Sequence, residues 1–172
     1  VTTIGANAFY DSFFLEEITI PESVSSIGNN AFYTRFTLKN INVVENNANY
    51  KSVEGNLYSK DGTILIKYSR GKRLETFTIP NNVTTIGANA FSDDETLTNI
   101  IIPNSVTSIE IDAFKNCSSL ERITIPNSVT RIEALAFENC SSLTSITIPS
   151  SVTRLASIAF FSCSSLETIV VD

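Results

Sequence analysis

The sequence predicts an α/β-type repeat solenoid of about seven coils, with a parallel β-sheet on one side and short turns or helical segments on the other. Two observations predict this fold. Most of the chain repeats with a period of 23 residues, as in 103–125 (PNSVTSIEIDAFKNCSSLERITI) and 126–148 (PNSVTRIEALAFENCSSLTSITI). Each repeat also contains the pattern L-x-x-I-x-I, whose last two apolar residues lie on one face of a short strand because side chains alternate along a strand.

The first half of each repeat supplies regular apolar positions. Counted from the proline that opens a repeat, a valine follows after three residues and an isoleucine or leucine after six. Ala-Phe follows after ten and eleven, so six of the eleven phenylalanines share one position: Phe9, Phe32, Phe91, Phe114, Phe137 and Phe160. One ring at the same place in successive coils predicts a stack of rings in the core.

The second half of each repeat is expected to form one strand per coil. The apolar triplets that mark these strands begin at Leu15, Leu38, Leu74, Leu97, Leu120, Leu143 and Leu166. Parallel pairing of successive strands at about 4.8 Å would give one continuous sheet. We therefore expect residues 1–172 to form a single solenoid domain.

One coil, 44–79, has 36 residues and lacks both the valine-isoleucine pair and Ala-Phe. Within it, residues 56–59 and 63–68 are strand-like and flank Asp61-Gly62. Asp-Gly between two such runs is typical of a hairpin whose two turn residues both have positive φ. The pattern predicts a β-hairpin that projects in place of the convex side of this coil.

These motifs resemble a known family. The run L-x-x-I-x-I-P-x-[SN] is similar to the leucine-rich repeat strand motif L-x-x-L-x-L-x-x-N, and the continuation V-T-x-I-x-x-x-A-F-x-x-C-S-S-L resembles BspA-like leucine-rich repeats. That family occurs in large surface proteins of host-associated bacteria and some protozoa, and inserted hairpins occur in its arrays. The positions that match the family's asparagine ladder are Ser23, Asn82, Ser105, Ser128 and Ser151.

The resemblance implies a binding surface on the concave face, formed by the residues that alternate with the apolar ones in each strand. The main candidates are Glu17, Thr19, Asn40, Asn42, Thr76, Thr78, Asn99, Ile101, Arg122, Thr124, Ser145, Thr147, Thr168 and Val170. A third column beside them contains Glu16, Lys39, Glu75, Thr98, Glu121, Thr144 and Glu167. The alternative is that threonine and valine occur there only because they suit a pleated, half-exposed surface.

The irregular coil offers a second candidate surface, because it holds six of the twelve basic residues together with three tyrosines. Such a cluster could stack on sugars or pair with an acidic partner. The alternative is a solvated hairpin whose tyrosines cover the edge of the core and whose lysines discourage strand pairing. The candidate residues are Tyr50, Tyr58, Lys60, Lys67, Tyr68, Arg70, Lys72 and Arg73.

Three cysteines, Cys117, Cys140 and Cys163, occupy one position in successive repeats. Side chains stacked in parallel do not offer the dihedral angle of a disulfide, so we expect a reduced column in the core. The densest acidic run, 93–95, contains ligand types that suit a hard cation, although its place between Phe91 and Leu97 favours a solvated turn.

Composition excludes several kinds of function. The net charge of −6 argues against a general nucleic-acid or anionic-membrane surface. No run approaches the length of a membrane span, and no signal peptide opens the chain. The chain has no histidine and no glycine-rich phosphate loop, so a Ser-His or Cys-His pair cannot form and no metal or cofactor is expected.

These observations predict a non-catalytic module that binds a protein or glycan partner at the cell surface, with adhesion as the role that the resemblance implies. The alternative is a structural spacer within a larger surface protein. Val1 lies in mid-repeat and the chain has no methionine, which indicates a piece of a longer protein or a chain trimmed at its start. Uncapped end coils predict end-to-end self-association.

Overall fold

The computed structural model describes residues 1–33 and 37–172 and divides into two compact units, Val1–Arg73 (the N-terminal unit) and Leu74–Asp172 (the C-terminal unit). Both are built from parallel strands in stacked coils, which confirms the predicted solenoid. In the described ranges the one helical element is a 3-10 turn, η1 (Arg70–Lys72), so turns replace the helical segments that were also considered. Continuity of the two units as one domain stays a prediction.

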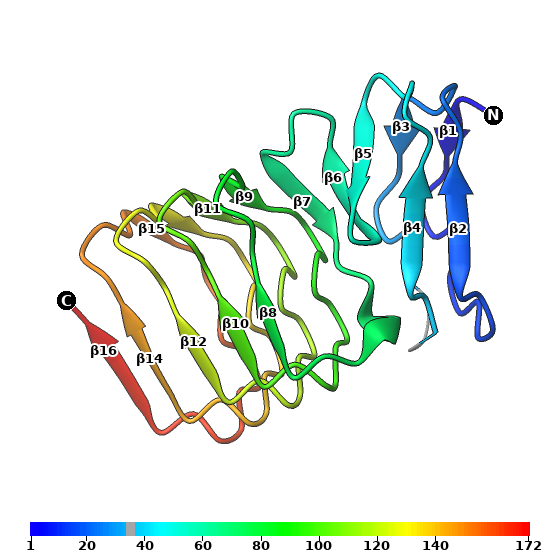
Figure 1. Ribbon diagram of the computed structural model, residues 1–172. Coiled ribbons are helices and arrows are strands. Elements are labelled where there is room, and N and C mark those ends of the chain that lie inside the picture. The colour runs from blue at the N-terminus through cyan, green and yellow to red at the C-terminus, as the bar shows by residue number, and fades with distance from the viewer. Residues whose placement is uncertain (34–36) are drawn as a thin grey trace. The chain divides into compact units, whose positions relative to one another are not determined.

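The main sheet of the C-terminal unit contains the predicted strands. β8 (Thr76–Thr78), β10 (Asn99–Ile101) and β12 (Arg122–Thr124) pair in parallel, as do β14 (Ser145–Ile148) and β16 (Thr168–Val171). The five strands follow one another along one side of this unit (Figure 1). Equivalent residues of successive repeats lie opposite one another, so the repeat pattern fixes the register.

A second parallel sheet covers another side of this unit and was not predicted from the sequence. Its two-residue strands are β9 (Thr85–Ile86), β11 (Ser108–Ile109), β13 (Arg131–Ile132) and β15 (Arg154–Leu155). They come from the V-T-x-I segment, for which the sequence predicted apolar core positions and no strand. Two residues suffice here because threonine hydroxyls add bonds to the preceding coil: Oγ1 of Thr130 donates to the Thr107 carbonyl at 3.2 Å.

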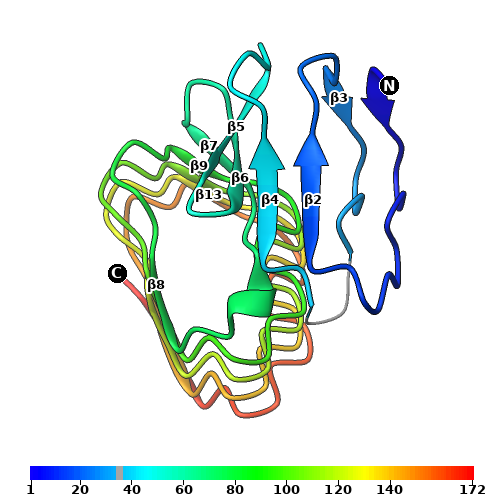
Figure 2. The ribbon, with the colours of Figure 1, turned by 45° about the vertical axis from the view of Figure 1, so that its right-hand side comes forward.

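The core of the C-terminal unit contains the predicted ring stack. The rings of Phe91, Phe114, Phe137 and Phe160 follow one another with centroids 5.2, 5.1 and 5.2 Å apart and nearly parallel planes. In Figure 2 the successive coils of this unit overlie one another, from green to red. The stack is therefore a structural core, as the repetition predicts.

Each regular coil of the C-terminal unit turns at two residues with left-handed backbone angles. The first directly precedes Ala-Phe and includes Asn89 (φ 57°), Leu135 (φ 58°) and Ile158 (φ 56°). The second lies four residues later and includes Asn116 (φ 58°) and Asn139 (φ 55°). Asparagine tolerates this conformation better than larger side chains do, so leucine and isoleucine at the first position carry strain.

The N-terminal unit begins with the same architecture. β1 (Thr3–Ile4) pairs with β3 (Ser26–Ile27), and β2 (Glu17–Ile20) pairs with β4 (Asn40–Val43), both in parallel. The rings of Phe9 and Phe32 stack at 5.8 Å. The unit then changes to an antiparallel meander of β5 (Tyr50–Val53), β6 (Asn56–Ser59) and β7 (Ile64–Lys67).

The meander corrects two details of the predicted hairpin. It contains two hairpins, and the two-residue turn with both φ values positive is Glu54-Gly55 (50° and 71°). At the predicted turn only Gly62 has positive φ (80°), because the loop is longer and Oδ1 of Asp61 organises it by accepting bonds from Thr63 N–H and the Ser59 hydroxyl. The meander also packs into the core, since Leu57 is fully buried.

The polar ladder that the family motif implied is present in a mixed form. Serine hydroxyls donate to valine carbonyls of the preceding coil, as Ser105 does to Val83 at 2.6 Å and Ser151 to Val129 at 2.8 Å. In the irregular coil a fully buried asparagine, Asn47, adds to the ladder. Its Nδ2 donates to the carbonyls of Pro21 and Val24, and its Oδ1 accepts from the N–H groups of Asn49 and Tyr50.

Candidate functional site

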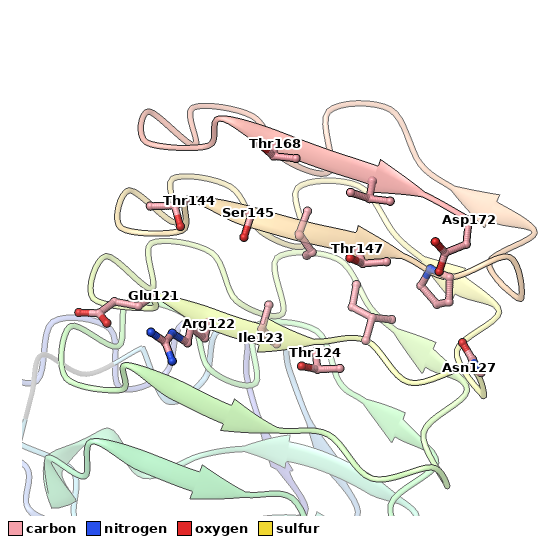
Figure 3. A pocket seen from close by; sticks show the side chains of 14 residues that line it. Glu121, Arg122, Ile123, Thr124, Asn127, Thr144, Ser145, Thr147, Thr168 and Asp172 are labelled. Atoms are coloured by element: carbon pink, nitrogen blue, oxygen red, sulfur yellow. The ribbon is translucent and has the colours of Figure 1, made fainter.

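A groove with a volume of about 920 Å³ crosses the exposed face of β12, β14 and β16 in the C-terminal unit (Figure 3). This volume suits a ligand of a few sugar or amino-acid units, because small-molecule sites span about 300–1,000 Å³. The lining residues are Glu121, Arg122, Ile123, Thr124, Ile125, Asn127, Thr144, Ser145, Ile146, Thr147, Pro149, Thr168, Val170 and Asp172.

Strand alternation explains the polar lining of this groove. Ile123 and Ile146 are buried, whereas the residues on either side of each are exposed. The parallel register places Ser145 opposite Thr168 and Thr147 opposite Val170, so like positions form rows across the strands. The groove therefore presents a grid of hydroxyl groups with one apolar side chain, Val170, in the row of Thr124 and Thr147.

Three charged side chains and one amide lie at the two ends of the groove. Glu121 and Arg122 lie at one end, and Asn127 and Asp172 lie at the other (Figure 3). Arg122 is the one basic residue among the lining residues, and within the described ranges it forms no ion pair. A free guanidinium in such a place can bind a planar anion through two parallel hydrogen bonds.

Two of the three other cations of the C-terminal unit form ion pairs. Nζ of Lys115 lies 2.5 Å from Oε2 of Glu138, and the Glu138 hydrogen bond, the largest cause, raises the pKa of Lys115. Nη2 of Arg154 lies 3.2 Å from Oε2 of Glu133. The unit as a whole has four basic and eleven acidic residues, a formal charge of −7. Arg122 is thus an isolated positive charge in an acidic surrounding.

The groove contains six of the main predicted face residues: Arg122, Thr124, Ser145, Thr147, Thr168 and Val170. Glu121 and Thr144 belong to the third predicted column of this face, whereas sequence reasoning did not include Asn127 and Asp172, which follow the strands. Their position just beyond the ends of alternating runs is the signal that could have found them.

The other predicted face residues do not line this groove. Thr76, Thr78 and Ile101 are exposed and Asn99 is half-buried on β8 and β10. In the N-terminal unit, Nδ2 of Asn42 donates a short hydrogen bond to Oε1 of Glu17, and Thr19 lies on the same strand as Glu17. The Asn40 side chain lies against Gly55, where an added Cβ would meet its Oδ1.

The predicted tyrosine and lysine surface of the irregular coil is largely buried. Tyr58, Lys67, Tyr68 and Arg70 are buried, because the rings cover apolar core and the basic stems pack with them. Burial and then the charge of Glu54 raise the pKa of Tyr58 to about 12. These four side chains therefore cannot contact a partner in this conformation.

The remaining residues of that surface are engaged or separate. Tyr50 is half-buried, and burial raises its pKa. Nζ of Lys60 donates to the Glu45 carbonyl at 2.8 Å, and Nζ of Lys72 donates to the Glu54 carbonyl, with burial lowering the Lys72 pKa. Arg73 is exposed with a left-handed backbone (φ 52°). The structure does not bring these eight residues together as one exposed cluster.

The three cysteines of the column are free thiols in this structure. Each thiol donates to a phenylalanine carbonyl of the preceding coil: Cys117 to Phe91 at 3.2 Å, Cys140 to Phe114 at 3.2 Å and Cys163 to Phe137 at 3.0 Å. A hydrogen bond with Cys163, followed by burial, raises the pKa of Cys140, so this thiol stays protonated. The column is part of the core hydrogen bonding.

The acidic run 93–95 is not a fully solvated turn. Asp94 is buried, and its Oδ1 accepts from the N–H groups of Thr96 and Leu97 at 2.8 and 2.7 Å. Asp93 accepts from Nδ2 of Asn116 at 2.8 Å. Residues 1–33 and 37–172 contain no cluster of acidic or cysteine side chains arranged for a metal ion, and no helix there has the length and apolarity to span a bilayer.

A scan against family models matches the BspA type leucine rich repeat region, with six copies over residues 1–61 and 62–172. A comparison with curated protein sequences finds no match. Among solved structures, the pneumococcal vaccine antigen PcpA is 30% identical with a TM-score of 0.91, over 99% of this chain and 42% of that one.

Two further solved structures are similar. A leucine rich cell surface protein from Faecalibacterium prausnitzii is 32% identical with a TM-score of 0.75, over 100% of this chain and 52% of that one. A leucine-rich repeat protein from Eubacterium ventriosum is 29% identical with a TM-score of 0.77, over 99% and 52%. The chain thus spans about half or less of the length of these proteins.

Proposed function

Because the chain belongs to the BspA-type leucine-rich repeat family, we propose that it is a non-catalytic recognition module that binds a protein or glycan partner at a cell surface. The observation that carries the proposal is the groove over β12, β14 and β16. Fourteen residues from three coils converge there, and the exposed polar side chains among them are not needed for the core of the repeats.

The chemistry of the groove favours binding over catalysis. Its hydroxyl groups have no histidine to activate them, because the chain contains none. Its lining holds donors and acceptors of hydrogen bonds and one free guanidinium, which suit recognition of a polar ligand. A surface location and an adhesive role belong to the same proposal, which the similarity to a cell surface protein of Faecalibacterium prausnitzii supports.

The test uses one residue at the centre of the groove. Thr147→Trp places a large ring over the groove, whereas Thr153→Trp places the same ring on an exposed position outside it. Each variant is displayed on cells in the full-length protein and scored for adhesion to host cells, matrix proteins and a glycan array. We expect Thr147→Trp to lower binding at least tenfold and Thr153→Trp to leave it unchanged.

The spacer function is the second candidate, and the absence of aromatic side chains from the groove lining favours it, since aromatic anchors dominate many protein interfaces. Replacing the chain with an unrelated repeat array of equal length separates the two functions. Full adhesion by the replaced protein, together with equal adhesion by both tryptophan variants, would establish the spacer and overturn recognition.

A further inference from the structure

We propose that the groove selects oligosaccharides that carry an isolated carboxylate, with Arg122 binding that carboxylate and the neighbouring hydroxyl rows binding the sugar. This inference rests on the proposed recognition function and names its ligand class. It follows from the position of Arg122, the composition of the lining and the charge of the C-terminal unit.

Arg122 offers a guanidinium that is available to a ligand. Its guanidinium is exposed at one end of the groove and has no ion pair in the described part of the chain. A carboxylate can accept two parallel N–H bonds from a guanidinium, an arrangement that a lysine or a neutral side chain cannot reproduce. The groove therefore favours a ligand with one planar acidic group at this end.

The side-chain composition of the groove lining favours a glycan over a peptide. Protein interfaces are anchored by buried aromatic and aliphatic side chains, and the groove has no aromatic residue. It instead presents the hydroxyls of Thr124, Thr144, Ser145, Thr147 and Thr168, each able to donate one hydrogen bond and accept others. The many hydroxyls of a sugar match this surface in number and in kind.

The negative charge around the groove limits the charge of the ligand. Glu121 adjoins Arg122, Asp172 lies at the far end, and the C-terminal unit has a formal charge of −7. A polymer with a carboxylate on every sugar would bring some of these charges within a Debye length, about 8 Å at physiological salt. One carboxylate against Arg122 avoids most of that repulsion, so the expected ligand is sparsely charged.

The experiment measures binding of the purified chain to an array of short oligosaccharides. The array contains sialyl- and hexuronate-terminated trisaccharides, the methyl ester of each, and a fully charged hexuronate polymer. Esterification keeps the sugar and removes only the charge. We expect the singly charged trisaccharides to bind at least tenfold more tightly than their esters and more tightly than the polymer at physiological salt.

Matched arginine variants identify the responsible residue. Arg131 is also exposed and without an ion pair in the described ranges, but it lies on β13, outside the groove. Arg122→Gln should lower the affinity for the acid at least tenfold and leave the ester unaffected, and Arg122→Lys should recover only part of the loss. Arg131→Gln should change neither by more than twofold.

The outcomes separate this inference from the proposed function. One outcome is that the best ligand is an ester, a neutral glycan or a peptide, with binding that Thr147→Trp abolishes and Arg122→Gln leaves unchanged. In that case the groove is a recognition site and the carboxylate inference is wrong. If an acid binds and Arg131→Gln weakens it as much as Arg122→Gln does, the attraction is general charge. If Thr147→Trp weakens binding of neither the acid nor any other ligand, both proposals are overturned.

Discussion

Single residues in the coil turns carry strain that can be removed. Ile158 is exposed and has a left-handed backbone, where β-branched side chains crowd the following carbonyl. Asparagine occupies the equivalent position at Asn7, Asn30 and Asn89. Ile158→Asn should therefore raise the free energy of unfolding by about 1 kcal/mol, measured by urea denaturation.

The reverse substitution is the control for that change. Asn89→Ile should lower stability, because it places a β-branched side chain at φ 57°. If Ile158→Asn leaves the unfolding midpoint unchanged while Asn89→Ile lowers it, the strain at Ile158 is relieved by relaxation of its own coil.

The carboxylate of Asp61 should make the second hairpin sensitive to acid. Hydrogen bonds from Ser59 and Thr63 lower its pKa from 3.8 to about 2. A lowered pKa in the folded state means that Asp61 contributes stability above pH 3.8 and that this contribution is lost as the pH falls toward 2. Comparison of acid unfolding curves for the parent and Asp61→Asn should show a smaller decrease for the variant over that window.

Asn47 should be the most sensitive asparagine of the irregular coil. Its buried amide makes four hydrogen bonds to backbone groups. Asn47→Ala leaves two backbone carbonyls and two backbone N–H groups unsatisfied, which should lower the free energy of unfolding by about 1–3 kcal/mol for each group. Asn46→Ala is the matched control, because Asn46 is exposed. Equal thermal unfolding of the two variants would show that relaxation or water replaces the lost bonds.

At the scale of structural elements, the phenylalanine stack is the main stabilising column of the C-terminal unit. Phe114 is fully buried between the rings of Phe91 and Phe137. Phe114→Ala should cost about 3–5 kcal/mol, because the truncation leaves a cavity between packed neighbours. A loss below about 1 kcal/mol in a denaturant titration would contradict a core role for the column.

The elements that sequence reasoning found are those that repeat. Phe114 and Leu120 recur at fixed spacing, so their burial and the strand register follow directly from the period. The second sheet was not predicted, because two-residue strands such as Ser108–Ile109 are too short to show an alternation of apolar and polar residues. Repetition predicts what successive coils share and cannot reveal which coil differs.

The candidate site was predictable only in part for the same reason. The face residues Arg122 and Thr147 follow from strand alternation, whereas the groove depends on turn residues such as Asn127 that lie beyond the strands. For Tyr58 and Tyr68 the sequence left two interpretations open, a binding surface or a cover for the edge of the core, because the meander has no repeat partner from which their burial could be inferred. Long-range packing decides that point.

At the scale of the whole molecule, charge and exposed apolar surface are unevenly distributed. The N-terminal unit has eight basic and seven acidic residues, a formal charge of +1, and the C-terminal unit has −7. The last coil of the chain exposes Leu155, Ile169 and Val171. In a chain of these 172 residues alone, we expect this coil to pair with another chain.

The 172-residue chain should therefore self-associate end to end as its concentration rises. Light scattering should show a mass that increases with concentration, and Val171→Lys should reduce the increase because a charge at an exposed strand end opposes pairing. A mass that stays at one chain over the full concentration range would rule the association out.

The antiparallel meander also bears on the order in which the N-terminal unit folds. Side-chain hydrogen bonds between regular coils join residues that are 22 to 26 positions apart, from Ser105 with Val83 to Cys140 with Phe114. In the meander the paired residues are far closer in sequence, from Val53 with Asn56 to Tyr50 with Ser59. Since the entropy lost on closing a loop grows with its length, the meander forms with the smallest loss of entropy and is the favoured folding nucleus of this unit. The coil that breaks the repeat is therefore the one from which the neighbouring regular coils can propagate.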